Sequence, residues 1–150
     1  MKKLILTTAI CSLILPTSMP ARAASQDDCA IWLCLPTGFP SGCSTAKRAF
    51  IKRIKKFKPP LPNIASCLLK SSEIPLEIRD QYKPSNLEYK EGIAAKMPTG
   101  QYIDGVRCRV YRYSKDDPWI RNPDGCLATY HWVQTYMDGK AYGKKYYYNY

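Results

Sequence analysis

The residues of this chain whose type and spacing could do chemistry are its seven cysteines. Cys11 lies in an apolar N-terminal segment that we expect to be removed. Six cysteines then remain, and they are Cys29, Cys34, Cys43, Cys67, Cys108 and Cys126. An even number of cysteines in an exported chain is typical of a disulfide framework in an oxidising compartment. The sequence therefore predicts up to three disulfide bonds.

A zinc site would be the alternative use of these cysteines, and their spacing argues against it. The chain has no C-x-x-C pair, and its one histidine, His131, is far in sequence from the cysteine-rich segment. Structural zinc sites usually draw their ligands from such closely spaced pairs. We therefore expect no metal and no cofactor.

The pairing of the first four cysteines is constrained by local geometry. Cys29 and Cys34 lie five residues apart in a segment that we predict to be helical, so their side chains point in different directions and they are poor partners for each other. Each should reach a different neighbouring segment. We predict bonds between Cys34 and Cys67 and between Cys29 and Cys43, while three pairings of four cysteines stay open on sequence grounds.

The last two cysteines, Cys108 and Cys126, stand on either side of a loop that contains Trp119. We predict a bond between them that ties the first connection of a C-terminal sheet.

Acidic residues and His131 are the remaining candidates for catalysis. A glycan-cleaving enzyme needs one carboxylic acid with a raised pKa and a second carboxylate beside it. No spacing selects such a pair from the candidate acids, which are Glu73, Glu77, Asp80, Glu88, Glu91, Asp104, Asp116, Asp117 and Asp124. We expect His131 to be packed or half-exposed in a strand. The sequence also lacks a phosphate loop and a nucleophile elbow, so we predict no catalytic residue and a protein that is not an enzyme.

The N-terminal segment 1–23 has the parts of a secretory signal peptide: two lysines, an apolar run over 4–15 and a small-residue site that ends at Ala23. A membrane anchor is the alternative, but the run is shorter than the ~20 residues needed to cross a bilayer. We expect cleavage after Ala23 and one mature domain over 24–150, located in the periplasm.

The first part of this domain, 24–70, should be helical and cysteine-rich. Acids after Ser25 suit a helix N-terminus, and a longer helix is predicted from Ser44 to Phe57. Its apolar positions recur at helical spacing and are Ala46, Phe50, Ile54 and Phe57.

The remaining parts should be an irregular connection over 71–105 and an antiparallel sheet over 106–150. Strands are predicted over 106–113, 127–137 and 140–149, the last two joined by a hairpin at Asp138-Gly139. The predicted fold class is therefore α+β, with disulfide-stapled N-terminal helices packed on a small three-stranded C-terminal sheet.

Two surfaces could contact a partner in this basic protein, whose formal net charge is +11. The first is the basic face of the longer helix, with Lys47, Arg48, Lys52, Arg53, Lys55 and Lys56. It could bind anionic lipid or nucleic acid, although we favour a solvated face on a helix that docks on its own core. The second is the aromatic tail, expected to be exposed, with Tyr146, Tyr147 and Tyr148. Ordinary cross-strand aromatic pairing is the simpler explanation of these tyrosines.

One segment carries a family resemblance. The run C-A-I-W-L-C-L-P-T-G-F-P-S-G-C, from Cys29 to Cys43, is followed by a basic helix and Cys67. It resembles the cysteine-rich domain of the TrbM/KikA/MpfK family of conjugal transfer proteins, in which a cysteine, an L-C-L step, a Gly/Pro turn and a further cysteine recur near the mature N-terminus. The resemblance covers about 40 residues, and the C-terminal half carries no motif of the family.

The resemblance implies an exported, non-enzymatic accessory of a plasmid-borne type IV secretion system, acting in mating-pair formation or pilus assembly during conjugation. Its partners would be protein components of that apparatus, with an anionic membrane surface as a further contact and no nucleic acid. A small periplasmic cell-wall enzyme and a basic membrane-active exported toxin are the alternatives.

Overall fold

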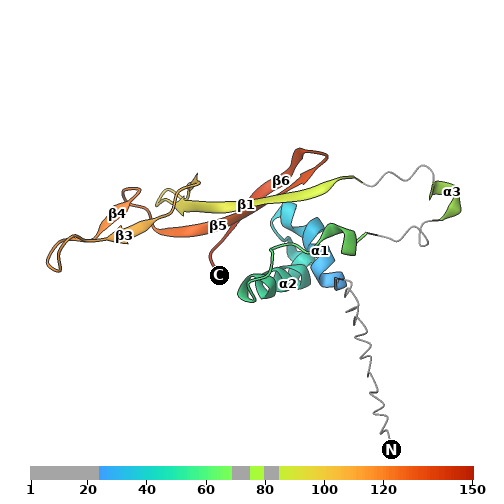
Figure 1. Cartoon of the computed structure of the whole chain (residues 1–150), viewed down its shortest axis with the longest axis horizontal. Helices are drawn as coiled ribbons and strands as arrows, with labels where there is room; N and C mark the ends of the chain where they lie inside the picture. The colour runs from blue at the N-terminus through green and yellow to red at the C-terminus, as the bar shows by residue number, and fades with distance from the viewer. Residues whose placement is uncertain (1–23, 69–74, 80–84) are drawn as a thin grey trace, which may run out of the picture.

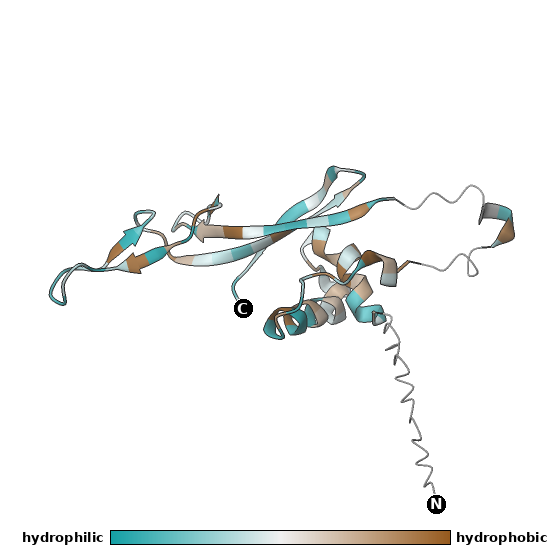
Figure 2. Ribbon diagram, viewed as in Figure 1, coloured by the Kyte–Doolittle hydropathy of each residue, from teal (hydrophilic) through white to brown (hydrophobic). Residues whose placement is uncertain are grey.

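The architecture is α+β, with a helical unit packed on one face of a curled antiparallel sheet and a narrow two-stranded arm at one end (Figure 1). The structure is a computed structural model, and it describes residues 24–68, 75–79 and 85–150. The predicted signal peptide, 1–23, lies outside these residues. Apolar residues gather in the helical unit and in short stretches of the strands (Figure 2).

The helical unit consists of short elements joined by tight turns. They are α1 (Gln26–Cys34), η1 (Leu35–Thr37), η2 (Ser41–Cys43), α2 (Ser44–Lys55) and η3 (Ile64–Ser66), and a separate turn of helix, α3, covers Leu76–Arg79. Ser25 caps α1, because its hydroxyl oxygen accepts the backbone N–H of Asp28 at 3.1 Å. Asp27 and Asp28 lie in the first turn, as predicted for a helix N-terminus.

The end of α2 differs from the prediction. The helix was expected to reach Phe57 with that ring on the apolar face, but it ends at Lys55, and Phe57 has a left-handed backbone with φ of 53°. Ala46 and Phe50 are buried as predicted, whereas the Phe57 side chain is 99 % exposed. The apolar spacing continues past the point where the backbone leaves the helix, so periodicity alone placed Phe57 on the wrong side.

The sheet has four strands, so the prediction of three is wrong. Its order is β2-β1-β5-β6, with β1 (Leu87–Lys96), β2 (Tyr102–Asp104), β5 (Ala128–Met137) and β6 (Lys140–Tyr148). β1 lies in the stretch predicted to be irregular, and it pairs with β5 along its whole length, from Leu87 opposite Met137 to Lys96 opposite Ala128. Tertiary pairing, which a local pattern does not show, makes this segment a strand.

The predicted strand over 106–113 is also corrected. Only Arg109–Tyr111 forms a strand there, β3, and it pairs with β4 (Ile120–Asn122) in a separate two-stranded sheet, the arm. The arm projects from one end of the main sheet (Figure 1). Its side chains are largely in solvent, with Tyr113 81 % and Trp119 62 % exposed, and the Arg112 guanidinium stacks over the Trp119 ring at 4.6 Å.

The β5–β6 hairpin confirms the prediction made from Asp138-Gly139. Met137 pairs with Lys140, and both central residues have left-handed backbones, with φ of 50° at Asp138 and 77° at Gly139. Two such residues are what a type I′ turn requires. The Asp138 carboxylate also accepts the backbone N–H of Asn86 at 2.8 Å, which fixes the start of β1 beside the turn.

All six described cysteines form disulfides, and the pairing of the first four corrects the prediction. The bonds are Cys29–Cys67, Cys34–Cys43 and Cys108–Cys126. Cys34 ends α1, and the two short turns η1 and η2 return the chain at once to Cys43, so these two cysteines are the natural neighbours. Cys29 in the first turn of α1 is then left to meet Cys67 after η3. The predicted bond of Cys108 with Cys126 is confirmed.

The core lies between the helical unit and the sheet. Its most buried members come from both layers and include Ile31, Leu35, Phe50, Leu61 and Val133. β6 approaches η1 closely at a bulge where three residues, 143–145, lie opposite the single residue Gln134. A Cβ on Gly143 would lie 2.6 Å from Cα of Pro36, so only glycine fits this contact.

The opposite, open face of the sheet is drawn together by side chains of its two edge strands. The rings of Tyr102 on β2 and Tyr147 on β6 stack with centroids 3.8 Å apart. Asp104 on β2 accepts a hydrogen bond from the Tyr147 hydroxyl at 3.0 Å and pairs with Lys145 on β6. These contacts between strands at opposite edges fit a strongly curled sheet.

Candidate functional site

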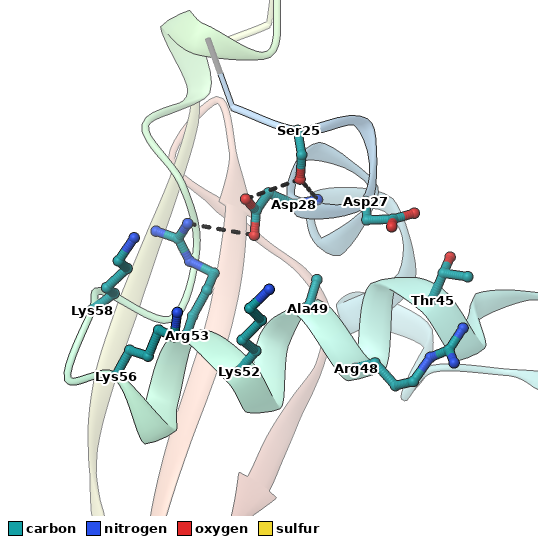
Figure 3. A pocket seen from close by; sticks show the side chains of 10 residues that line it. All are labelled: Ser25, Asp27, Asp28, Thr45, Arg48, Ala49, Lys52, Arg53, Lys56 and Lys58. Carbon is teal, nitrogen blue, oxygen red and sulfur yellow. Dashed lines mark hydrogen bonds and ion pairs between the residues drawn. The ribbon is translucent and has the colours of Figure 1, made fainter. Parts of the chain in front are cut away.

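A cleft of about 460 Å³ separates the N-terminal end of α1 from α2 and the segment after it (Figure 3). Cationic side chains dominate its lining. The lining residues are Ser25, Asp27, Asp28, Thr45, Arg48, Ala49, Lys52, Arg53, Lys56 and Lys58. We call this the basic cleft.

Arg53 has a structural role in the basic cleft. Its Nε donates to the carbonyl of Pro59 at 2.9 Å, and its second terminal nitrogen donates to the carbonyl of Leu61 at 3.1 Å. Its other terminal nitrogen lies 3.5 Å from the carboxylate of Asp28. Arg53 therefore ties α1 to the chain that returns after α2, and of the predicted basic residues it is the one least available to a partner.

Three cations form a ridge along the wall of the cleft that is made by α2 and the residue after it. Arg48, Lys52 and Lys56 follow one another at four-residue spacing, which places them on one side of a helix about 6 Å apart. α2 contains no acidic residue, and within the described part of the chain none of the three forms an ion pair. Like charges at this spacing destabilise a helix slightly. Because none of the three is paired with an acid among the described residues, their charge is available to an anionic ligand.

The opposite wall contributes little compensating charge. Asp28 is already paired with Arg53 and accepts a hydrogen bond from the Ser25 hydroxyl at 3.0 Å, which leaves Asp27 as the second acid of the lining. Five cationic and two acidic side chains line the cleft, so it has a net positive charge. It fits carboxylates or phosphates presented by a partner.

The predicted basic surface is only partly the surface of this cleft. Lys47 and Lys55 are exposed on α2 outside the lining. Lys58 joins the lining although it follows the helix, and Asp27 joins it from α1. The periodicity of one helix cannot reveal residues that a second segment brings to the same place.

The tyrosines of the C-terminal tail are not the exposed surface that was predicted. Tyr148 is 6 % exposed, and its ring and that of Tyr146 pack edge-on against Phe50 at 5.1 and 5.6 Å. Tyr147 points to the other face, where it bonds to Asp104. Burial is the main reason why the pKa values of Tyr147 and Tyr148 are raised to about 12.

The remaining candidates do not converge on the cleft. His131 is exposed on β5, and its ring stacks 5.7 Å from that of Tyr148. Within the described residues, no three His, Cys, Asp or Glu side chains gather closely enough to bind a metal ion. None of the helices described here has the length and apolar character needed to span a membrane.

The three disulfides indicate an oxidising, extracytoplasmic location for the protein. Comparison with models of protein families, with curated proteins and with solved structures gives no match for this chain.

Proposed function

We propose that this chain is an exported, non-enzymatic accessory protein of conjugative DNA transfer, which acts in the periplasm by binding protein components of a type IV secretion apparatus. The basic cleft is the proposed contact, and its partner is an acidic segment of another protein. The observation that carries the proposal is the ridge of Arg48, Lys52 and Lys56, which is held on a disulfide-bonded frame and has no charge partner among the described residues.

The geometry favours a protein segment as the ligand. Alternate side chains of an extended strand lie about 6.6 Å apart, close to the ~6 Å steps of the ridge. The second wall adds Asp27 and the hydroxyl of Ser25, and Thr45 adds a hydroxyl from α2; these groups can pair with a cation or accept backbone N–H groups of a bound segment. Asp27 favours a ligand that also carries a cation or N–H donors over one that is uniformly anionic. The resemblance of the segment from Cys29 to Cys67 supplies the link to conjugation.

The test is the frequency of plasmid transfer. Deletion of the gene from a conjugative plasmid that carries it should lower transfer, and the intact gene supplied in trans should restore it. A triple variant of the ridge, R48Q/K52Q/K56Q, should fail to restore transfer. The control K47Q/K55Q, on the same helix but outside the cleft, should restore it.

Unchanged transfer after deletion would overturn the proposal. Equal restoration by both variants would move the contact away from the basic cleft. The amount of oxidised protein in the periplasm is measured for each variant, so that loss of the protein is not mistaken for loss of the contact.

A further inference from the structure

Three described residues other than glycine have a left-handed backbone, namely Phe39, Phe57 and Asp138. Such a backbone is unfavourable for residues with a side chain, and for a bulky one it needs a reason. The fold supplies that reason at two of the three positions. Asp138 lies in the type I′ turn, and Phe39, with φ of 58°, places its ring in the core, 5.0 Å from the ring of Tyr146.

Phe57 has no such reason within the fold. It follows the end of α2, where its N–H bonds to the carbonyl of Ile54 at 3.0 Å and the next N–H, of Lys58, bonds to the carbonyl of Arg53 at 3.0 Å. This is the helix-ending position that glycine usually takes. A phenylalanine here is strained in its backbone, and its ring is 99 % exposed, so it gains nothing from burial.

Lysines surround this ring in sequence. The run Lys55-Lys56-Phe57-Lys58 begins at the last residue of α2, whose last turn also contains Lys52. Lys52, Lys55, Lys56 and Lys58 are all exposed. A protruding aromatic ring among cations on long, flexible stems is the combination that binds the interface of an anionic bilayer, where the ring enters the headgroup region and the ammonium groups meet the phosphates.

We propose that Phe57 and its neighbouring lysines form a tip that docks reversibly on an anionic lipid surface. The one apolar group of the tip stands fully in solvent, and this suits a flat, deformable surface. Only one aromatic ring and a few lysines take part, so the contact is peripheral and salt-sensitive. Lys52, Lys56 and Lys58 also line the basic cleft, so the ring of Phe57, which does not, is what distinguishes this contact from that of the cleft's protein partner.

The test uses the purified, oxidised protein and vesicles of phosphatidylcholine with and without phosphatidylglycerol. Co-sedimentation should show binding to the vesicles that contain phosphatidylglycerol and release by salt. F57G should bind about tenfold more weakly, because the ring no longer leaves water. Each lysine removed, as in K55Q and K58Q, should weaken binding about fivefold.

F57G separates docking from folding. Glycine suits the left-handed position, so this variant should melt no lower than the natural protein while its binding falls. F57W should keep binding. Its additional tryptophan emission is obtained by subtracting the spectrum of the natural protein with the same vesicles. This emission should shift to shorter wavelength when the anionic vesicles are added. L33A is the matched control, since Leu33 is 74 % exposed on α1 and should be replaceable without effect on binding.

Three results would overturn the proposal. They are absence of binding to anionic vesicles, equal binding by F57G and the natural protein, and emission of F57W that does not shift. The first, together with normal plasmid transfer by F57G, would show that the ring serves neither a membrane nor the transfer partner. The vesicle assay contains no transfer apparatus, so its failure leaves the proposed function of the basic cleft standing.

Discussion

Single residues decide how closely the two layers of this protein approach, and Gly143 is the clearest case. Its φ of 77° disfavours a side chain, and its position against Pro36 excludes one. Gly143→Ala should therefore lower the free energy of unfolding by about 3 kcal/mol or more, since a strained backbone and a steric overlap add. Urea unfolding of the oxidised protein measures this difference.

Gly100→Ala is the matched control for that substitution. Gly100 has a similar φ of 83°, but a Cβ there would meet no atom within 4 Å. The control should lower the free energy of unfolding by only about 1 kcal/mol, because the strained backbone is its only effect. An equal loss in the two variants would mean that the overlap with Pro36 is relieved by a small shift of β6 away from η1.

Buried tyrosines make the protein sensitive to alkaline pH. Burial, with smaller effects from Glu91 and Tyr89, raises the pKa of Tyr148 from 10.0 to about 12. Between these values the unfolded chain loses the phenolic proton and the folded protein keeps it, so stability that is present below pH 10 is lost as the pH rises toward 12.

The measurement is the free energy of unfolding at a series of alkaline pH values. Tyr148→Phe should make the decline above pH 10 less steep, because one raised phenol is gone. Tyr142→Phe, at an exposed tyrosine of the same strand, is the control and should leave the slope as it is. Identical slopes for all three proteins would assign the alkaline loss to other groups.

At the scale of elements, the sequence predicted those strands whose formation depends on residues that are close together in the chain. The Asp138-Gly139 turn fixes its own backbone, so β5, β6 and their pairing follow from sequence. β1 does not, because its sequence L-E-Y-K-E-G-I-A-A-K contains few strongly strand-forming residues and its hydrogen bonds come from a distant partner. The basic cleft was predicted only as one wall, because its second wall comes from α1.

The three disulfides should differ in what they stabilise. The bond of Cys29 with Cys67 closes 38 residues and joins α1 to the end of the helical unit, where the core lies. The double variant C29A/C67A should lose about 4 kcal/mol of unfolding free energy by the chain-entropy relation. C108A/C126A opens a loop of 18 residues with mostly exposed side chains and should lose about 3 kcal/mol or less.

Urea unfolding compares the two variants, and peptide mapping without reduction checks the three pairs. A greater loss in C108A/C126A than in C29A/C67A would show that the arm contributes to the core more than its exposure suggests. A peptide that links Cys34 to Cys67 would contradict the pairing described above.

At the scale of the whole molecule, stability should be unevenly distributed. The arm is a two-stranded ribbon without a covering layer, whereas β1 and β5 are paired along ten residues each. Of these two parts, the arm should therefore be cut by trypsin first, after Arg112 or Lys115, and β1 much later, after Lys96. The N-terminal and C-terminal fragments should stay joined without reducing agent and separate with it, because Cys108 and Cys126 lie on either side of both sites.

Gel electrophoresis with and without reduction gives the readout. Early cleavage after Lys96 would place the weakest part of the molecule in the main sheet instead. The comparison needs only the natural protein, so it does not depend on any variant folding.

The pairing of β1 with β5 has a consequence for the order of events as the chain emerges. Every residue of the two N-terminal disulfides has appeared by Cys67, so the helical unit can close early. Leu87, by contrast, pairs with Met137, so the edge of β1 that meets β5 must stay unpaired until nearly the whole chain has arrived, while β2 covers only residues 94–96 of the other edge. During that interval the strand is open to any passing extended segment, and a folding helper that shields it would act at this step.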